Sequence, residues 1–422
     1  MTLAGESTDT TTAPRSLWRN RDFMFLWVGE SASMIGSSVT YVAFPLVAAL
    51  YLHASAWQMG LVATAAGLPS LFFGLFVGAL VDRLPQRALM LVADLGRMLL
   101  TASIPIAAFL HVLVIWQLAA CSFLSGALTL VFTTTYQAFF PEVVTLDKVT
   151  DGNGKLAASQ SFAEVVGPGI AGGLMSAIGI PAALLADAAS FLASALGITA
   201  LRTRPPAHPR PGAAAPFWQQ TKAGFALLRQ DKVLARLTAS TAVVNFSSQI
   251  QTAVYFLFLG RSLHLSPGLI GALYTASGVI GLATSLLADK IAGRIGLRGL
   301  AALGQWAQIA GAALLALAHG SHIVASAFIV SGEALFSIGM PLFAVGFSSL
   351  RQQRIRPQDR GKVIGASRFI SSALLPLAAA TGGLLGSAFS LRAALLTGAV
   401  GMACGGLLLI GVPDATKGSA KE

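Results

Sequence analysis

Charged side chains are scarce in this sequence: they make up 11% of its 422 residues, whereas 55% of the residues are hydrophobic. An ordinary soluble domain carries roughly 25% charged residues. So few charges cannot cover a water-facing surface, which argues against a soluble enzyme, a disordered chain and a coiled coil. The composition instead predicts an all-α membrane protein with many spanning helices.

Cysteine is almost absent, since only Cys121 and Cys404 occur, and both lie inside apolar runs. Two isolated thiols match neither a disulfide framework nor the ligand spacing of a metal site. The sequence also has no recognisable Ser/His/Asp arrangement, phosphate-binding loop or metal-binding cluster. We therefore expect no enzyme activity, no metal and no cofactor.

Long apolar runs dominate the rest of the chain. A membrane-spanning helix needs about 20 mostly apolar residues. The first run is too long for the core of a cleavable signal, so we interpret it as a retained membrane helix. The twelve predicted spans are 23–47, 60–81, 88–110, 113–134, 157–178, 182–200, 236–260, 268–288, 299–318, 323–349, 363–387 and 391–411.

A proline-rich stretch divides the twelve spans into two sets of six. Five prolines between residues 205 and 216 exclude a spanning helix there and indicate a linker. We therefore predict two six-helix bundles with cytoplasmic segments between and around them. The predicted parts are an N-terminal segment 1–22, a bundle 23–200, a linker 201–235, a second bundle 236–411 and a tail 412–422.

Basic residues gather on one side of this predicted topology. Of the 28 Lys and Arg residues, only Arg261 and Arg392 fall in loops on the opposite side, and Arg97 and Arg368 lie within predicted helices. Cytoplasmic loops are the ones enriched in Lys and Arg. The pattern predicts a multi-pass protein of the plasma membrane with both termini in the cytoplasm. It also accounts for the net charge of +11 without nucleic-acid binding.

The two halves repeat one another. The loop motif that ends in Asp82-Arg83 recurs 207 residues later as Asp289-Lys290, and in each copy an Arg follows the Asp by five residues. A duplicated six-helix unit predicts a substrate site between the halves, near the middle of the membrane. The residues of the two loop copies on which this comparison rests are Gly78, Asp82, Arg83, Arg87, Asp289, Lys290 and Arg294.

The sequence resembles the major facilitator superfamily over essentially its whole length. The resemblance rests on the loop at 78–87, its weaker copy at 285–294 and the segment Gly167-Pro-Gly-Ile-Ala-Gly-Gly173. The segments 17–23 and 186–191 are similar to the branch that holds enterobactin and macrolide exporters. The resemblance implies two six-helix bundles that transport a substrate by alternating access.

The resemblance also implies conformational roles. Asp82 is expected to contact the start of the eleventh span near Gly361 and so to latch the outward-open state, with Arg83 and Arg87 completing a charge cluster. We expect Asp94 and Arg97, from the start of the third span, to join this cluster. Pro85 stands where the family usually has Gly, so the turn is expected to differ in detail.

In the fifth span, the resemblance assigns Gly167-Pro168 and Gly172-Gly173 to exporters that exchange substrate for protons. Proline permits a bend, and small residues allow close helix packing. Ordinary helix packing is the alternative interpretation. One family feature is missing, because no Arg occurs in 117–126 of the fourth span, where many drug–proton antiporters carry one.

Four carboxylates lie within predicted spans: Glu30, Glu333, Glu164 and Asp187, ranked in that order as functional candidates. Each costs about 2.5–3.5 kcal/mol to insert, so each is a candidate for proton or cation binding. Burial favours the neutral form of a carboxyl group, which is the chemistry of proton-coupled export. The alternative is a neutral carboxyl group hydrogen-bonded between helices.

A polar stripe in the seventh span contains Asn245 and Gln249, with Thr241 and Thr252 on the same helix face. It could contact a polar part of a substrate or bond to a neighbouring helix, and the sequence does not favour either.

The combined reading predicts a proton-coupled exporter of small amphipathic compounds such as a drug, a macrolide or a siderophore. Its expected partners are the lipid bilayer, a small-molecule substrate and the proton as coupling ion, and we expect a monomer that binds no nucleic acid. The alternatives are an uptake or lipid-moving transporter of the same fold, or a receptor or assembly subunit that transports nothing.

Overall fold

The computed structural model describes residues 17–74, 76–144, 148–202 and 217–410, and all regular structure in these residues is helical. The predicted all-α class is therefore confirmed. The first half contains a short helix at Leu17–Arg19, α1 (Arg21–Leu46), the π-helix η2 (Val47–Tyr51), α2 (Ala56–Phe73), α3 (Val77–Arg83), α4 (Gln86–Phe109), α5 (Ile115–Val143), α6 (Val149–Ile178) and α7 (Leu184–Thr199).

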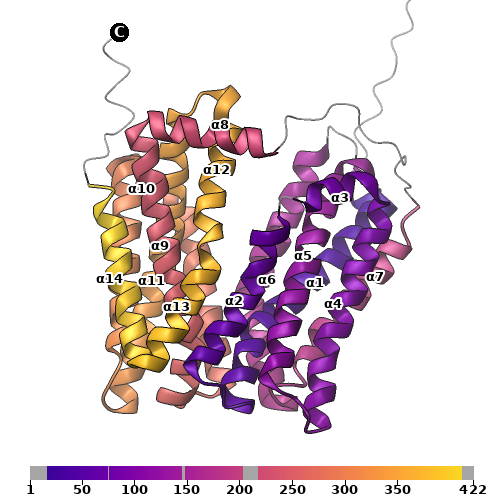
Figure 1. Ribbon diagram of the computed structural model, residues 1–422, viewed down its shortest axis with the longest axis horizontal. Coiled ribbons are helices and arrows are strands. Elements are labelled where there is room, and N and C mark those ends of the chain that lie inside the picture. The colour runs from indigo at the N-terminus through magenta and orange to yellow at the C-terminus, as the bar shows by residue number, and fades with distance from the viewer. Residues whose placement is uncertain (1–16, 75, 145–147, 203–216, 411–422) are drawn as a thin grey trace, which may run out of the picture.

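The second half has the corresponding helices. They are α8 (Phe217–Gln230), α9 (Lys232–Leu257), the π-helix η4 (Phe258–Ser262), α10 (Pro267–Leu317), α11 (His322–Arg354), a short helix at Pro357–Asp359, α12 (Arg360–Ala373), α13 (Leu375–Ala388) and α14 (Leu391–Leu407). Figure 1 shows α1–α7, in indigo to magenta, beside α9–α14, in rose to yellow.

Nine helices in the described residues are long and apolar enough to span a membrane, and two shorter apolar helices are α7 and α14. One of the nine, α10, has 51 residues and is bent at Gly296, whose positive φ of 73° interrupts the helix. The bend divides α10 into two spans, because glycine adopts positive φ without a steric penalty. Counted in this way, the helices correspond to the twelve predicted spans.

The structure differs from the predicted spans at two helices. The second predicted span is divided into α2 and α3, and the eleventh is divided into α12 and α13. In the eleventh span, Pro376 supplies no N–H for the helical hydrogen bond, and the helix is interrupted at Leu374, two residues before this proline. The predicted linker contains α8 in its described part. Its last residues belong to α9, which is capped by the side chain of Asp231.

The halves meet through glycines in two helix pairs, α2 with α13 and α6 with α10. A Cβ added to Gly60 would lie 2.7 Å from the Cα of Gly383, and one added to Gly172 would lie 3.0 Å from the Cα of Gly271. Gly271 follows Gly60 by 211 residues, as Gly383 follows Gly172. The internal repeat therefore places equivalent glycines at both contacts, where only glycine allows the backbones to approach so closely.

Hydrogen bonds between the halves lie at the same end of the molecule. The Thr64 hydroxyl donates to the carbonyl of Pro376 at 3.0 Å, and the Arg261 Nε donates to the carbonyl of Ala49 at 2.9 Å. The second bond joins η2 to η4, the π-helical ends of the first and seventh spans. We call this the closed end; it carries the turns at His53 and His264. The opposite end, which carries the loops after α3 and α11, is the basic end.

Candidate transport cavity

A cavity of about 480 Å³ lies between the halves and is lined mainly by the first half. This volume lies in the range of small-molecule sites. Helices α1, α4, α5 and α6 supply most of its wall, and Tyr274 from α10 contributes from the second half. The wall combines serine and threonine hydroxyls with aromatic rings, two carboxylates and one arginine. Such a wall can accept an amphipathic molecule.

Two of the four predicted carboxylates, Glu30 on α1 and Glu164 on α6, face this cavity. The Glu30 side chain is half-buried, and its Oε2 atom has no hydrogen-bond partner among the described residues. Glu164 is exposed and accepts a hydrogen bond from the Gln160 amide at 2.7 Å. Glu30 therefore lacks the hydrogen-bond partner that Glu164 has, and it can accept a proton or contact a cation.

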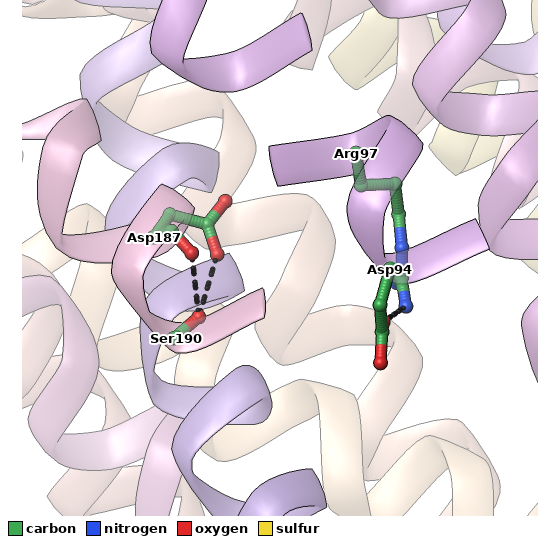
Figure 2. Close-up of polar contacts among 4 residues, drawn as sticks. All are labelled: Asp94, Arg97, Asp187 and Ser190. Carbon is green, nitrogen blue, oxygen red and sulfur yellow. Dashed lines mark hydrogen bonds and ion pairs between the residues drawn. The ribbon is translucent and has the colours of Figure 1, made fainter. Parts of the chain in front are cut away.

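Arg97 and Asp94 form a buried ion pair on α4 (Figure 2). Arg97 is 5% exposed and Asp94 is fully buried. The Arg97 guanidinium lies between the rings of Phe132 and Phe191, at 4.4 Å from each ring centroid. Cation–π contacts and an adjacent carboxylate stabilise a cation that is nearly buried.

In this structure Asp94 and Arg97 lie inside the bundle, away from the loop charge cluster that the sequence predicts. Arg97 follows the first residue of α4 by eleven positions, or roughly 16 Å along the helix. It lines the cavity and is enclosed by aromatic rings, so its charge lies inside the bundle. A charge can occupy this depth because Asp94 of the same helix pairs with it and rings from α5 and α7 pack against it, and the sequence of the loop does not reveal the position of these rings.

Asp187 is 1% exposed and lies between α7 and α1, outside the cavity wall. Its carboxylate accepts hydrogen bonds from the Thr40 hydroxyl of α1 and, at 3.1 Å, from the Ser190 hydroxyl of its own helix. Figure 2 shows the Asp187–Ser190 contact on α7 beside the Asp94–Arg97 pair on α4. Asp187 thus lies in the same bundle interior as Arg97.

We expect Gly36→Ala to destabilise the first half, because a Cβ at Gly36 would lie 2.1 Å from the Ser190 Oγ and 2.7 Å from the Asp187 Oδ1. Forcing a methyl group into a packed interior costs about 1–3 kcal/mol. Thermal unfolding of the purified protein in detergent measures the effect. Gly173→Ala is the matched control, since nothing lies within 4 Å of its added Cβ. Equal melting temperatures for the two variants would contradict the prediction.

Glu333 on α11 lies in the second half, and it is not among the residues that line the cavity. Its carboxylate accepts hydrogen bonds from the Tyr255 hydroxyl of α9 and, at 3.2 Å, from the Ser277 hydroxyl of α10. An aromatic cluster separates it from the cavity. The Tyr274 ring stacks on Phe256 with a centroid distance of 5.4 Å, and Tyr255 and Tyr41 pack against the same two rings.

The predicted gating residues lie near the basic end. Asp82 and Arg83 are exposed, and Arg87 donates a hydrogen bond to the carbonyl of Thr199 at the end of α7. Asp82 makes no hydrogen bond or ion pair with any residue of the described part, so the predicted contact with the start of α12 is not formed in this structure. The residues of the second copy, Asp289, Lys290 and Arg294, are exposed on α10. A Cβ added to Gly78 of the first copy would have nothing within 4 Å.

The glycine motif of α6 lies at packing contacts. A Cβ at Gly167 would lie 2.3 Å from the Ser38 Cβ of α1, and Gly172 faces α10, whereas Gly173 faces open space. Pro168 lines the cavity. Asn245 and Gln249 of α9 are half-buried and are not among the cavity-lining residues, so their predicted substrate contact stays a prediction.

Several partners of the predicted site residues were not identified from the sequence. The rings around Arg97, the Thr40 hydroxyl that bonds Asp187 and the two hydroxyls that bond Glu333 come from helices far apart in the chain. The sequence does point to two of these partners, Ser190 and Phe191, because they belong to the segment 186–191 that carries part of the family resemblance. The tyrosines near Glu333 had no such signal.

Comparisons with known proteins agree with this architecture. The family model of the Major Facilitator Superfamily matches residues 26–375 and 237–422. Macrolide efflux protein A of Streptococcus pyogenes is 24% identical over 374 residues, covering 84% of this chain and 87% of that protein. Multidrug efflux pump Tap of Mycobacterium tuberculosis is 27% identical over 414 residues, with 94% of each chain covered. The crystal structure of nucleoside transporter NupG has a TM-score of 0.73 and 12% identity, over 94% of this chain and 99% of that one, and shows the shared fold.

Proposed function

We propose that this chain, which belongs to the major facilitator superfamily, exports small amphipathic compounds from the cell in exchange for protons. The observation that carries the proposal is the cavity, where the unpartnered carboxyl group of Glu30 lies among aromatic and hydroxyl side chains. The efflux relatives at 24% and 27% identity support export as the direction of transport.

We place the basic end and both termini in the cytoplasm, because positive charge favours that side of the membrane. The described glycine contacts and hydrogen bonds between the halves lie at the closed end, away from the basic loops. With this orientation, the structure represents an inward-open state in which a substrate enters the cavity from the cytoplasm or the inner leaflet.

Outward opening would separate the glycine pairs at the closed end and bring the halves together at the basic end. Asp82 would then contact the positively polarised N-terminus of α12, a position that favours a carboxylate. This accounts for the exposed position of Asp82 in the inward-open state. The arginines at 83 and 87 would add further charge contacts to the closed basic end.

Glu30 would bind and release the proton that is exchanged for substrate. A proton taken up from outside neutralises it, and proton release to the cytoplasm leaves a carboxylate that can attract a cationic group of the substrate. The rings of Tyr41, Phe132 and Tyr274 give the cavity apolar and cation–π contacts for the rest of an amphipathic molecule. Glu333 would act as a second proton site in the other half.

Transport by purified protein in liposomes tests the proposal. A pH-sensitive dye is enclosed, a proton gradient is imposed, and erythromycin and ethidium are added separately as probes. We expect probe-dependent proton movement whose direction shows exchange. Proton movement together with the probe would show uptake instead. No proton movement with either probe, from protein shown to be folded, would contradict the proposal and favour a lipid-moving or non-transporting role.

A further inference from the structure

In the interior of the first half, carboxyl side chains outnumber basic side chains around Arg97. Asp94 on α4 pairs with its guanidinium, Glu30 on α1 lines the same cavity, and Asp187 precedes by four residues Phe191 of α7, whose ring packs against Arg97. Tyr136 on α5 lies near Glu30 and carries no charge at neutral pH. One cation is therefore grouped with three carboxyl groups, one on its own helix α4 and one each on α1 and α7.

Because carboxyl groups are in excess, some of them must be protonated. If all three carboxyl groups were ionised, the cluster would carry two uncompensated negative charges, and two of its carboxyl groups, Asp94 and Asp187, are fully or almost fully buried, which makes this state unfavourable. Neutrality is reached when two of the three groups are protonated. Asp94 forms the direct ion pair with Arg97, so it is the group that stays ionised. Glu30 and Asp187 are left to hold the protons.

The two remaining acids differ in access. Glu30 lines the cavity, so its proton can be exchanged on that side. Asp187 is enclosed between α1 and α7 and is bonded by Thr40 and Ser190. Its proton can leave only when α1 moves relative to α7. The cluster thus combines a proton site open to the cavity with one controlled by helix packing.

We propose that Arg97 is a positioning residue that sets the charge of this cluster: it keeps Asp94 ionised and leaves Glu30 and Asp187 as the groups that hold exchangeable protons. The rings of Phe132 and Phe191 hold its guanidinium between them, so Arg97 acts as a fixed counter-charge. The inference rests on the proposed exchange of protons for substrate, and it names the residues that would determine the number of protons held.

Infrared spectra of the purified protein test this charge assignment without any transport. The carbonyl stretch of protonated carboxyl groups is recorded across a pH series for the wild type, Arg97→Gln, Arg97→Lys and the control Arg229→Gln, whose arginine is exposed on α8. We expect Arg97→Gln to gain one protonated carboxyl signal, which Asp94→Asn then removes. Arg97→Lys and Arg229→Gln should keep the wild-type signal. No gained signal in Arg97→Gln, from folded protein, would overturn the proposal.

A double variant separates this role from a purely structural one. Removing one partner of a buried ion pair destabilises a protein, whereas removing both is often tolerated, so Asp94→Asn with Arg97→Gln is expected to fold. We expect its probe-driven proton movement in liposomes to stay close to that of the wild type, because removing one negative and one positive charge together leaves Glu30 and Asp187 as the groups that hold protons. A fall of about tenfold or more in the folded double variant would overturn the proposal. If the wild type itself moves no protons, the proposed function fails, while the infrared result still decides the charge assignment.

Discussion

Glu30→Gln is expected to reduce probe-driven proton movement in liposomes by about a hundredfold or more, the range typical of losing a positioned proton-transfer group. Glutamine keeps the size of the side chain but can neither take up nor release a proton. Among the described residues that line the cavity, the other carboxylate is Glu164, which is exposed and already bonded by Gln160. Probe binding without a proton gradient is expected to persist for an uncharged probe.

Two carboxylates at other positions provide comparisons for Glu30→Gln, one on the surface and one in the second half. Asp151→Asn changes an exposed carboxylate that pairs with Lys155 on the surface of α6, and such pairs contribute little. It should leave proton movement unchanged. Glu333→Gln is expected to have a smaller effect than Glu30→Gln, since Glu333 lies behind the aromatic cluster. Unchanged proton movement in both glutamate variants would reject this assignment and direct attention to Glu164 and Asp187.

Gly172→Val is expected to shift the protein away from the inward-open state. Even a Cβ at this position would lie 3.0 Å from both the Gly271 Cα and the Pro267 carbonyl oxygen, so the α6–α10 contact cannot form as described. Overpacking of this kind costs about 1–3 kcal/mol, which is a shift of about 5- to 150-fold in a two-state population. Spin labels at His111 and His319, both exposed at the closed end, should report a longer distance.

Two variants control the Gly172→Val measurement. Gly173→Val carries the same substitution at the next residue, where an added Cβ has nothing within 4 Å, and should leave the label distance unchanged. Asp82→Asn removes the proposed latch of the outward-open state and should shift the population in the opposite direction, toward the inward-open state. The same distance in all three variants would show that neither the glycine contact nor the latch controls opening.

The sequence indicates some residues of the cavity but not their surroundings. A carboxylate in an apolar run is costly, which singles out Glu30 and Glu164, and both face the cavity. For Arg97 the sequence gives only a position along the chain, near the start of the third span. Its actual surroundings, two phenylalanine rings from α5 and α7, are a property of three packed helices.

The sequence by itself determined the number of spans and the internal repeat, because apolar length and residue spacing are properties of the linear chain. The division of α10 at Gly296 and the break before Pro376 follow local backbone rules as well. Only the tertiary structure decided which polar groups meet: Asp94 with Arg97, Asp187 with Thr40, and Glu333 with Tyr255. A buried polar side chain is stabilised by its neighbours, and in a helical bundle most of these neighbours come from other helices.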